Sequence, residues 1–499
     1  MNPLDRLVSW VAPQAGLARV RARSALTLID GATRSYEGAK RRRGNGKAPG
    51  TSANAEIGPA HVELRNRARS LVRNNPHCAR VVDIHTGNIV GSGIIPVPKT
   101  GSKRANAQVA ALWRQFVDTC DADGQLDFYG LQAIAMREMV EAGEVLARFR
   151  PRRPSDGLPV PLQVQMLEAD HLDSSRDGPL QGARTILGVE FDAIGRRSAY
   201  WLYPEHPGER RQLRSLRSVR VEAADILHLY RKQRAGQVRG VTAFAPVVMM
   251  SRDLADFHEA AIVKARIEAC FAGFVTNPEG DKVTVGTSAG DDAGQRVQTI
   301  EPGMLNYMQP GEQVSFAQPT ASPVFDSFMI HTLMAIAVGA GITYDQLTGD
   351  LRQANYSSLR AGKIEFRRLT EQMQHQVFIP MFCAPVWRRF VEMAVLAGKL
   401  PAREGGYPCE WITPANEPID PVKDMTADIL AVRSGRMTFD QFVASWGNDP
   451  ATQIADIKRI NALFDADGII LDIDPRKVAR TGNAQATQGA PAAPDDTQA

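Results

Sequence analysis

The sequence predicts an α+β protein with helices at both ends of a β-rich region. Apolar residues recur at helical spacing before residue 142 and again after residue 244, whereas residues 144–232 alternate with a period of two. The chain has 499 residues, of which 43% are hydrophobic and 23% are charged. This length and composition are typical of a globular protein with more than one buried core.

The first 58 residues differ in composition from the rest of the chain. They are rich in Arg, Gly, Ser and Ala and contain the run Lys40-Arg41-Arg42-Arg43. Such charge runs are usually disordered, and some bind nucleic acid. We predict a basic, partly disordered arm over 1–58, with a solvated tail as its simplest role. The net charge of +4 is too small to indicate a partner by itself.

Four helices are predicted between this arm and the β-rich region. Helical spacing begins near His61, and Asn75-Pro76 provides the N-cap and first-turn proline of a second helix. Two more helices are predicted over 106–117 and 131–142, and Gly143 is the predicted stop of the last one.

The β-rich region contains five strand candidates. Each combines a period of two with β-branched or aromatic residues, and they cover residues 145–149, 162–167, 188–191, 199–203 and 226–230. The stretch DAIGRRS, between the third and fourth candidates, indicates a hairpin turn.

Long helices return after this region. One is predicted over about 244–274 and another from Ser322-Pro323 to Gly339, with short β-type segments between them. A third begins at Ser357 or Ser358, and Pro380 and Pro385 are predicted to bend it.

Three short helices are predicted near the C-terminus. Their starts are indicated by Asp420-Pro421, by a capping box of Thr438 with Gln441, and by Asp449-Pro450. The composition of 476–499 then predicts a disordered tail.

One string fits a serine-hydrolase motif. GTSAG, residues 286–290, matches G-x-S-x-G with Ser288 as the nucleophile. A nucleophile elbow requires a strand before the serine and a helix after it, but the following DDAGQRVQT has no apolar helical stripe. A loop of small residues is therefore the favoured interpretation, and a serine hydrolase using Ser288 is a less favoured alternative.

No convincing metal or cofactor site is predicted. EADHLD, residues 168–173, gathers carboxylates around His171, but no second cluster has matching spacing, so a solvated turn is favoured. The five cysteines form no C-x-x-C pair, and no phosphate-binding glycine motif occurs. The uncharged stretch around 328–344 is interrupted by glycine and histidine, which favours a buried helix over a membrane span. With no catalytic residue predicted, a structural or binding protein is favoured.

Six blocks in a fixed order resemble the lambda-type portal protein family of tailed bacteriophages. They are RNRARSLVRNNPHCARVVDIHTGNIVGSGI (65–94), LQVQMLEADHLD (162–173), ILGVEFDAIGRRSAYWLY (186–203), ADILHLYRKQRAGQVRGVTAFAPVV (224–248), EPGMLNYMQPGEQVSFAQPTASP (301–323) and YDQLTGDLRQANYSSLRAGKIEFRR (344–368). The resemblance covers most of residues 60–475 and is carried by the order and spacing of the blocks.

The resemblance implies a non-enzymatic virion protein without cofactors. It would form a homo-oligomeric ring, usually a dodecamer, at one capsid vertex, after assembly in the host cytoplasm. Double-stranded DNA would be packaged and ejected through its channel, without sequence-specific contacts. The implied protein partners are the terminase large subunit, head-completion or tail adaptor proteins acting as the head-tail connector, and the major capsid and scaffolding proteins, with no membrane contact.

The family's portal fold also implies a division of the chain. The expected parts are an α/β wing (59–242), a first stem helix (243–274), a small β-rich clip (275–320), a second stem helix (321–343), a tunnel loop (344–358), a long bent helix with the wing/crown connection (359–420) and a helical crown (421–475).

The tunnel loop is where the resemblance implies DNA contact. Its residues facing the DNA channel would be Arg352, Gln353, Asn355 and Ser357, since polar groups and one cation can touch phosphates without reading bases. Asp345 and Asp350 would limit the attraction. Lys264 and Arg266 are possible channel-facing residues of the stem. Two alternatives remain: an ordinary exposed helix connection, and another DNA-binding capsid or adaptor component that uses the basic arm.

Overall fold

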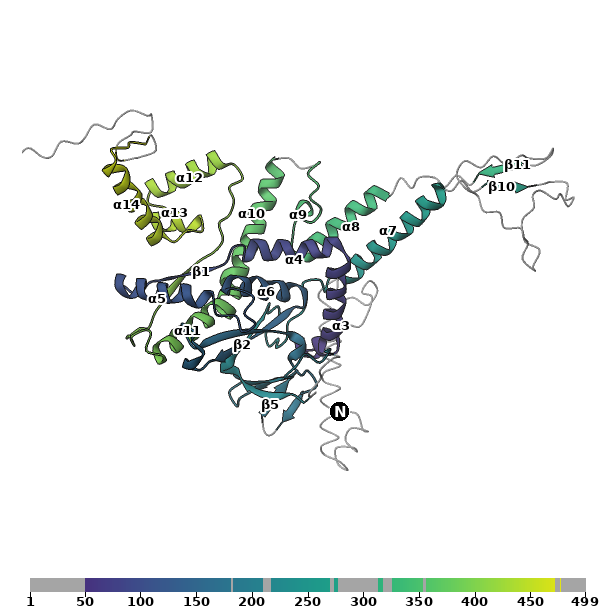
Figure 1. Cartoon of the computed structure of the whole chain (residues 1–499). Coiled ribbons are helices and arrows are strands. Elements are labelled where there is room, and N and C mark those ends of the chain that lie inside the picture. The colour runs from purple at the N-terminus through teal and green to yellow at the C-terminus, as the bar shows by residue number, and fades with distance from the viewer. Residues whose placement is uncertain are drawn as a thin grey trace, which may run out of the picture. The chain divides into compact units, whose positions relative to one another are not determined.

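The computed structural model describes residues 50–180, 183–209, 217–269, 273–276, 313–316, 325–352, 356–471 and 476. The chain divides into two compact units, Met1–Ser52 and Ala53–Ala499, and all the helices and strands named here belong to the second. This unit combines helices with antiparallel sheets, so the predicted α+β class is confirmed (Figure 1).

Four helices precede the sheets, as predicted: α3 (Ala53–Asn74), α4 (Pro76–Ile89), α5 (Lys103–Val117) and α6 (Phe128–Glu141). Asn75 caps α4, because its side chain accepts from the backbone N–H of His77 at 3.0 Å and of Cys78 at 3.3 Å. Gly143 follows α6 with a φ of +91°, a conformation that favours glycine.

Helix α3 begins earlier than predicted, so residues 53–58 belong to it and not to a disordered arm. The later start was predicted because apolar helical spacing begins near His61, and Pro59 lies inside the helix. Tertiary contacts hold the first turn: the Asn54 amide donates to the carbonyl of Gly236 and accepts from the N–H of Val238, both at 2.9 Å.

Two antiparallel sheets follow the helices. The first has the order β3-β2-β9, with β2 Glu144–Pro151, β3 Leu162–Glu168 and β9 Ile226–Tyr230. The second has the order β4-β5-β6-β7-β8, with β4 Gly178–Leu180, β5 Ala183–Ile186, β6 Val189–Phe191, β7 Arg197–Leu202 and β8 Val219–Glu222. All five predicted strands are present, and β6 and β7 form the predicted hairpin with Val189 opposite Tyr200.

The main hydrophobic core joins helices from distant parts of the sequence. Trp113 on α5 is 3% exposed, and its ring centroid lies 5.1 Å from that of Phe128 on α6. On α11 (Ala384–Leu396), the rings of Trp387 and Phe390 lie 5.1 Å and 4.9 Å from Trp113. This aromatic cluster closes the core between α5, α6 and α11.

A π-helix interrupts the third long helix. Helix α10 (Tyr356–Met373) continues through a π-helical stretch, Gln374–Cys383, into α11. The sequence predicted a bend at Pro380, which lies inside the π-helical stretch, where the altered hydrogen-bond register accommodates a residue without an N–H. Helix α10 begins at Tyr356, slightly before the predicted serines. Farther along the chain, β12 (Cys409–Ile412) pairs with β1 (Ile95–Pro98).

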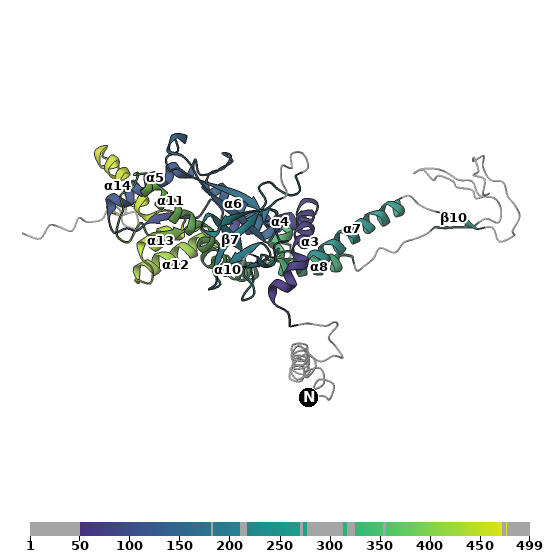
Figure 2. The same ribbon diagram turned by 90° about the horizontal axis from the view of Figure 1, so that it is seen from below.

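Helices α7 (Val248–Ala269) and α8 (Phe325–Ala340) lie side by side in both views (Figures 1 and 2). The ring of Phe257 on α7 packs 4.6 Å from that of Phe328 on α8. The chain after α7 and before α8 forms an antiparallel pair of strands, β10 (Gly273–Thr276) and β11 (Gln313–Phe316). Helix α7 is therefore shorter than the predicted 243–274. Residues 277–312, which include Ser288 and the GTSAG string, lie outside the described residues.

The three C-terminal helices begin where their capping signals predict: α12 (Pro421–Arg433), α13 (Phe439–Ser445) and α14 (Pro450–Ala466). Asp420 accepts from the N–H of Lys423 at 3.2 Å, and Asp449 accepts from that of Thr452 at 3.1 Å. Thr438 forms the predicted capping box with Gln441. In the described part of the chain, no helix combines the length and apolar character needed to cross a bilayer.

Candidate functional site

The segment between α8 and α10 contains a short helix, α9 (Tyr344–Thr348). The backbone N–H of Thr343 donates to the Gln346 side chain at 3.0 Å, which caps its start. Gly349, with a φ of +69°, ends it in the left-handed conformation that glycine adopts without strain. The described part of the predicted loop 344–358 thus consists of a helical turn, the connection 349–352 and the first turn of α10.

Helix α4 holds the start of this segment. His85 Nε2 lies 2.9 Å from the carbonyl oxygen of Ala340, and Arg80 Nε donates to the carbonyl oxygen of Gln346 at 3.4 Å. Burial lowers the pKa of His85, so a neutral ring donating from Nε2 fits this contact. Leu347 is 3% exposed. The segment is therefore anchored through α9, and Gly349, Leu351 and Arg352 after it are exposed.

Arg352, the predicted DNA-facing cation, is paired within its own loop. Its side chain is 85% exposed and donates from Nε and Nη2 to the two carboxylate oxygens of Asp350, at 2.9 Å and 2.8 Å. The Arg352 N–H also donates to Asp350 at 3.1 Å. Hydrogen bonds from the Arg352 side chain and backbone lower the pKa of Asp350 to about 2. The pair therefore carries little net charge at neutral pH.

The other predicted site residues are only partly described. Gln353 and Asn355 lie outside the described residues, and Ser357 lies in the first turn of α10. Lys264 and Arg266 are exposed on α7. Side chains two residues apart on an α-helix point in directions that differ by about 200°. Lys264 and Arg266 therefore do not lie on the same face of α7. A channel surface formed by α7 can therefore include one of these two cations directly, but not both.

The EADHLD segment is not the solvated turn that the sequence suggested. Asp170 accepts from Arg65 Nη2 at 2.9 Å and from Arg69 Nη1 at 2.7 Å, and both arginines come from α3. Burial alone would raise the pKa of Asp170, but the two guanidinium groups lower it. The sequence missed this arrangement because the arginines precede Asp170 by about a hundred residues.

Glu168, Asp170 and His206 place their potential ligand atoms within 4.8 Å of one another. Arg69 already bridges the two carboxylates, however, at 2.5 Å from Glu168 and 2.7 Å from Asp170. A metal ion there would face a fixed guanidinium charge. These residues fit a salt-bridge network that fixes α3 to the end of β3 better than they fit a metal centre.

A second buried charge network centres on Glu144, the first residue of β2. Glu144 is 2% exposed and accepts from Arg239 Nε at 2.8 Å and from the Gly240 N–H at 2.7 Å. Arg239 is itself fully buried. Burial would raise the pKa of Glu144, but Arg239 and a hydrogen bond from His228 hold it well below its usual value. In the sequence, the only indication of this network was that a carboxylate, Glu144, stands at the start of an apolar strand.

His228 makes the stability of this network pH-dependent. Its Nε2–H donates to Glu144 at 2.9 Å and its Nδ1 accepts from Arg197 at 3.0 Å, an arrangement that requires a neutral ring. Burial lowers the pKa of His228 to about 4. Because the unfolded histidine titrates near 6.5, the unfolded state binds more protons between about pH 6.5 and 4. The free energy of unfolding should therefore fall as pH decreases through that window.

Urea unfolding at a series of pH values from about 7 to 4.5 tests this expectation. His228→Gln should reduce the pH slope, since glutamine keeps a donor and an acceptor but does not titrate. His375→Gln, at an exposed position, is the control and should retain the wild-type slope. Equal slopes for the two variants would contradict the role assigned to His228.

A cavity of about 890 Å³ lies beside the anchored segment. It is lined mainly by apolar side chains of α6, α8 and α10, including Met136, Val338 and Phe366, and Arg231 and Lys232 also line it. Its lining contains no carboxylate, cysteine or serine among the described residues. His85 also lines the cavity, with its Nε2 held by the carbonyl oxygen of Ala340.

Comparison with known proteins identifies relatives across most of the chain. Residues 39–374, about two thirds of the chain, match the family described as phage portal protein, lambda family. The chain is 26% identical over 462 residues to the probable portal protein of Halomonas phage phiHAP-1, covering 86% of this chain and 88% of the relative. It is 22% identical over 452 residues to portal protein B of Escherichia phage lambda, covering 80% and 84%.

Solved structures with lower similarity include one described as the neck of a native GTA particle computed with C12 symmetry. That match has 16% sequence identity and a TM-score of 0.42, and it covers 77% of this chain and 94% of that chain. An HK97 family phage portal protein from Corynebacterium diphtheriae matches with 9% identity and a TM-score of 0.33, covering 73% and 98%.

Proposed function

Because this chain belongs to the lambda family of phage portal proteins, we propose that it forms a ring at one capsid vertex and surrounds the channel for double-stranded DNA. The family match over residues 39–374 is the observation that carries this proposal. Portal proteins of this family are structural components of the phage particle, and the channel would serve both packaging and ejection. We expect the ring to dock the terminase large subunit during packaging, and head-completion or tail adaptor proteins afterwards.

The described elements fit the expected parts of such a subunit. We assign the region up to residue 242 to the wing and the paired helices α7 and α8 to the stem. The β10–β11 pair would belong to the clip, and α12–α14 would form the crown. The tunnel loop, residues 344–358, would then include α9 and the exposed connection that carries Arg352. In a ring, each copy of this connection would contribute to one collar around the DNA.

The Arg352–Asp350 pair suits a collar that must touch DNA without holding it. Arg352 is 85% exposed and Asp350 is 21% exposed, and ion pairs at the surface contribute little net stability. A passing phosphate can therefore replace the Asp350 carboxylate as the partner of Arg352 with little net change in free energy. Contacts with phosphates are independent of base sequence, as packaging of a whole genome requires.

Charge variants in this loop should change DNA packaging and leave ring assembly intact. Arg352→Ala combined with Asn355→Ala should lower the amount of packaged DNA several-fold, because the collar loses its phosphate contacts. Asp350→Asn should bind DNA more tightly and slow packaging, because Arg352 loses its internal partner. Nuclease-protected DNA per capsid measures packaging, and negative-stain electron microscopy checks the rings. Normal packaging by the Arg352/Asn355 double variant would contradict the tunnel-loop assignment.

The ring itself can be tested on the purified protein at high concentration. Negative-stain images should show particles with a central hole, and mass photometry should give a mass near twelve chains of 54.5 kDa. Monomers or dimers without a pore under all assembly conditions would contradict the proposed function.

A further inference from the structure

The C-terminal helices bury very little of their apolar surface within one subunit. Helix α12 has no buried residue, α13 buries only Val443, and α14 buries only Pro450. Ten large apolar side chains of this region are exposed: Val422, Ile429, Leu430, Phe439, Ile454, Ile457, Ile460, Leu463, Ile469 and Ile470. Short helices need a packed apolar face for stability, and exposed apolar patches of this kind mark interaction surfaces.

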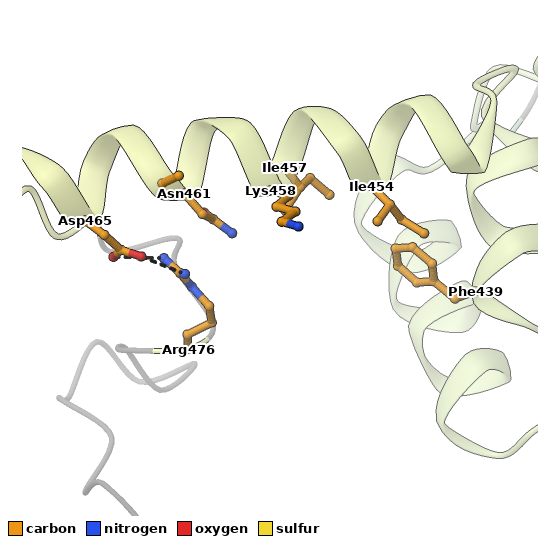
Figure 3. A pocket seen from close by; sticks show the side chains of 8 residues that line it. Phe439, Ile454, Ile457, Lys458, Asn461, Asp465 and Arg476 are labelled. Carbon is orange, nitrogen blue, oxygen red and sulfur yellow. Dashed lines mark hydrogen bonds and ion pairs between the residues drawn. The ribbon is translucent and has the colours of Figure 1, made fainter. Parts of the chain in front are cut away.

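One of these surfaces is a groove between α13 and α14, with a volume of about 490 Å³. Its apolar wall consists of Phe439 from α13 and of Ile454 and Ile457 from α14. Figure 3 shows the ring of Phe439 opposite Ile454, with Lys458 projecting from the same side of α14. The ion pair between Asp465 and Arg476, at 3.2 Å, lies at the other end of the groove (Figure 3).

A ridge lies farther around the same helix, where Ile460 borders the groove residue Ile457 and Leu463 lies on the side opposite Ile454. Ile460 and Leu463 are 39% and 55% exposed. At 3.6 residues per turn, they point away from the side of α14 that carries Ile454. Asp456 and Asp467 lie four residues before Ile460 and four residues after Leu463, so they flank this ridge on the same face.

The ridge and the groove are complementary in charge as well as in polarity. The ridge is apolar with a carboxylate at each end, whereas the groove carries Lys458 beside its apolar wall and the paired Asp465 and Arg476 at its other end. In the described part of the chain, Lys458 has no ion pair, and Asp456 contacts only Arg459, at 3.4 Å. A carboxylate of the ridge can therefore pair with Lys458 when the ridge fills the groove.

We propose that the Ile460–Leu463 ridge of one subunit docks into the Phe439–Ile454–Ile457 groove of the next copy of this chain. The inference rests on the proposed ring and assigns one of its subunit contacts. Because the ridge and the groove are two different surfaces of the subunit, the contact is head-to-tail. Contacts of this type continue from subunit to subunit and close into a ring, whereas a face that pairs with itself stops at a dimer.

Cysteine cross-linking tests this contact. Ile457→Cys combined with Leu463→Cys places one thiol in the groove and one on the ridge. After mild oxidation, assembled rings of the double variant should give a ladder of covalent multimers on a non-reducing denaturing gel. Each single variant should remain monomeric on that gel, as should wild type with its native cysteines. The matched control is Ile457→Cys with Ala455→Cys, because exposed Ala455 lies outside the ridge, about 80° around α14 from Leu463.

The possible outcomes separate this contact from the ring itself. Rings without a ladder would overturn the ridge–groove contact and leave the proposed function intact. Covalent dimers from Leu463→Cys alone would indicate that two ridges meet, which also overturns it. Absence of rings from wild type would contradict the proposed function.

A second variant tests the contact without introducing cysteines, which could themselves impair assembly. Ile460→Ser with Leu463→Ser changes only exposed side chains, so unfolding of the isolated subunit should stay as in wild type. The same variant should make the ring dissociate at lower urea concentration. Wild-type ring stability in this variant would overturn the contact.

Discussion

Glu144→Gln is expected to lower the free energy of unfolding by about 3–5 kcal/mol, which is the usual cost of removing one partner from a buried ion pair. The substitution leaves the fully buried guanidinium of Arg239 without its carboxylate. It also weakens the acceptor for His228 and for the Gly240 N–H. Because this network joins β2, β9 and the chain before residue 242, the loss should affect the folding of the whole β-rich region.

Urea unfolding of the purified subunit measures this effect. The matched control is Glu222→Gln, because Glu222 pairs with Arg220 at the surface and should be nearly dispensable. Replacing both buried partners, as in Glu144→Leu with Arg239→Met, should recover part of the loss, since no uncompensated charge then remains. Equal effects of Glu144→Gln and Glu222→Gln would show that the buried network does not stabilise the fold.

Trp113→Ala is expected to lower the free energy of unfolding by a similar amount, about 3–5 kcal/mol, because it leaves a cavity in the main core. The indole is 3% exposed and contacts aromatic rings from two other helices, α6 and α11. Those contacts connect the N-terminal helices with a helix almost three hundred residues later. The substitution should therefore loosen α11 from α5 as well as remove buried apolar surface.

Thermal unfolding followed by near-ultraviolet circular dichroism measures this loss, with Leu396→Ala as the control. Leu396 lies on α11 but is 74% exposed, so its truncation should change the melting temperature little. Hydrogen exchange should also become faster in α11 of the Trp113 variant. A melting temperature equal to that of the control would contradict the packing role of Trp113.

Local signals allowed much of the fold to be predicted from the sequence. Asn75, Thr438 and Asp449 cap the helices whose starts they indicated, because capping depends on residues within one turn. Four of the five predicted strands, β2, β3, β7 and β9, have five to eight residues and show a period of two, whereas the three-residue β6 was indicated by the hairpin signal that follows it. The missed strands β4, β5 and β8 have three or four residues, too few for a period to be recognised.

Features that depend on distant partners could not be predicted. The start of α3 depends on contacts between Asn54 and residues near 237. The surroundings of Asp170 and Glu144 depend on arginines about a hundred residues away. The DNA contact of the loop with Arg352 was inferred from resemblance to a family and stays a prediction. The pairing of Arg352 with Asp350 is local in the sequence. The side chains that line a channel, however, depend on how neighbouring copies of the chain pack, and the sequence of one copy does not give that packing directly.

In the proposed ring, the pairing of Arg352 with Asp350 would affect the friction on DNA moving through the channel. If each Arg352 pairs with Asp350 whenever no phosphate is in contact, then the advance of the DNA by one phosphate replaces one anionic partner of Arg352 with another. The energy profile along the channel would be smooth, and the loops would oppose motion in both directions equally little. The direction of transport would then come entirely from the packaging motor on the way in and from the pressure of the packed genome on the way out.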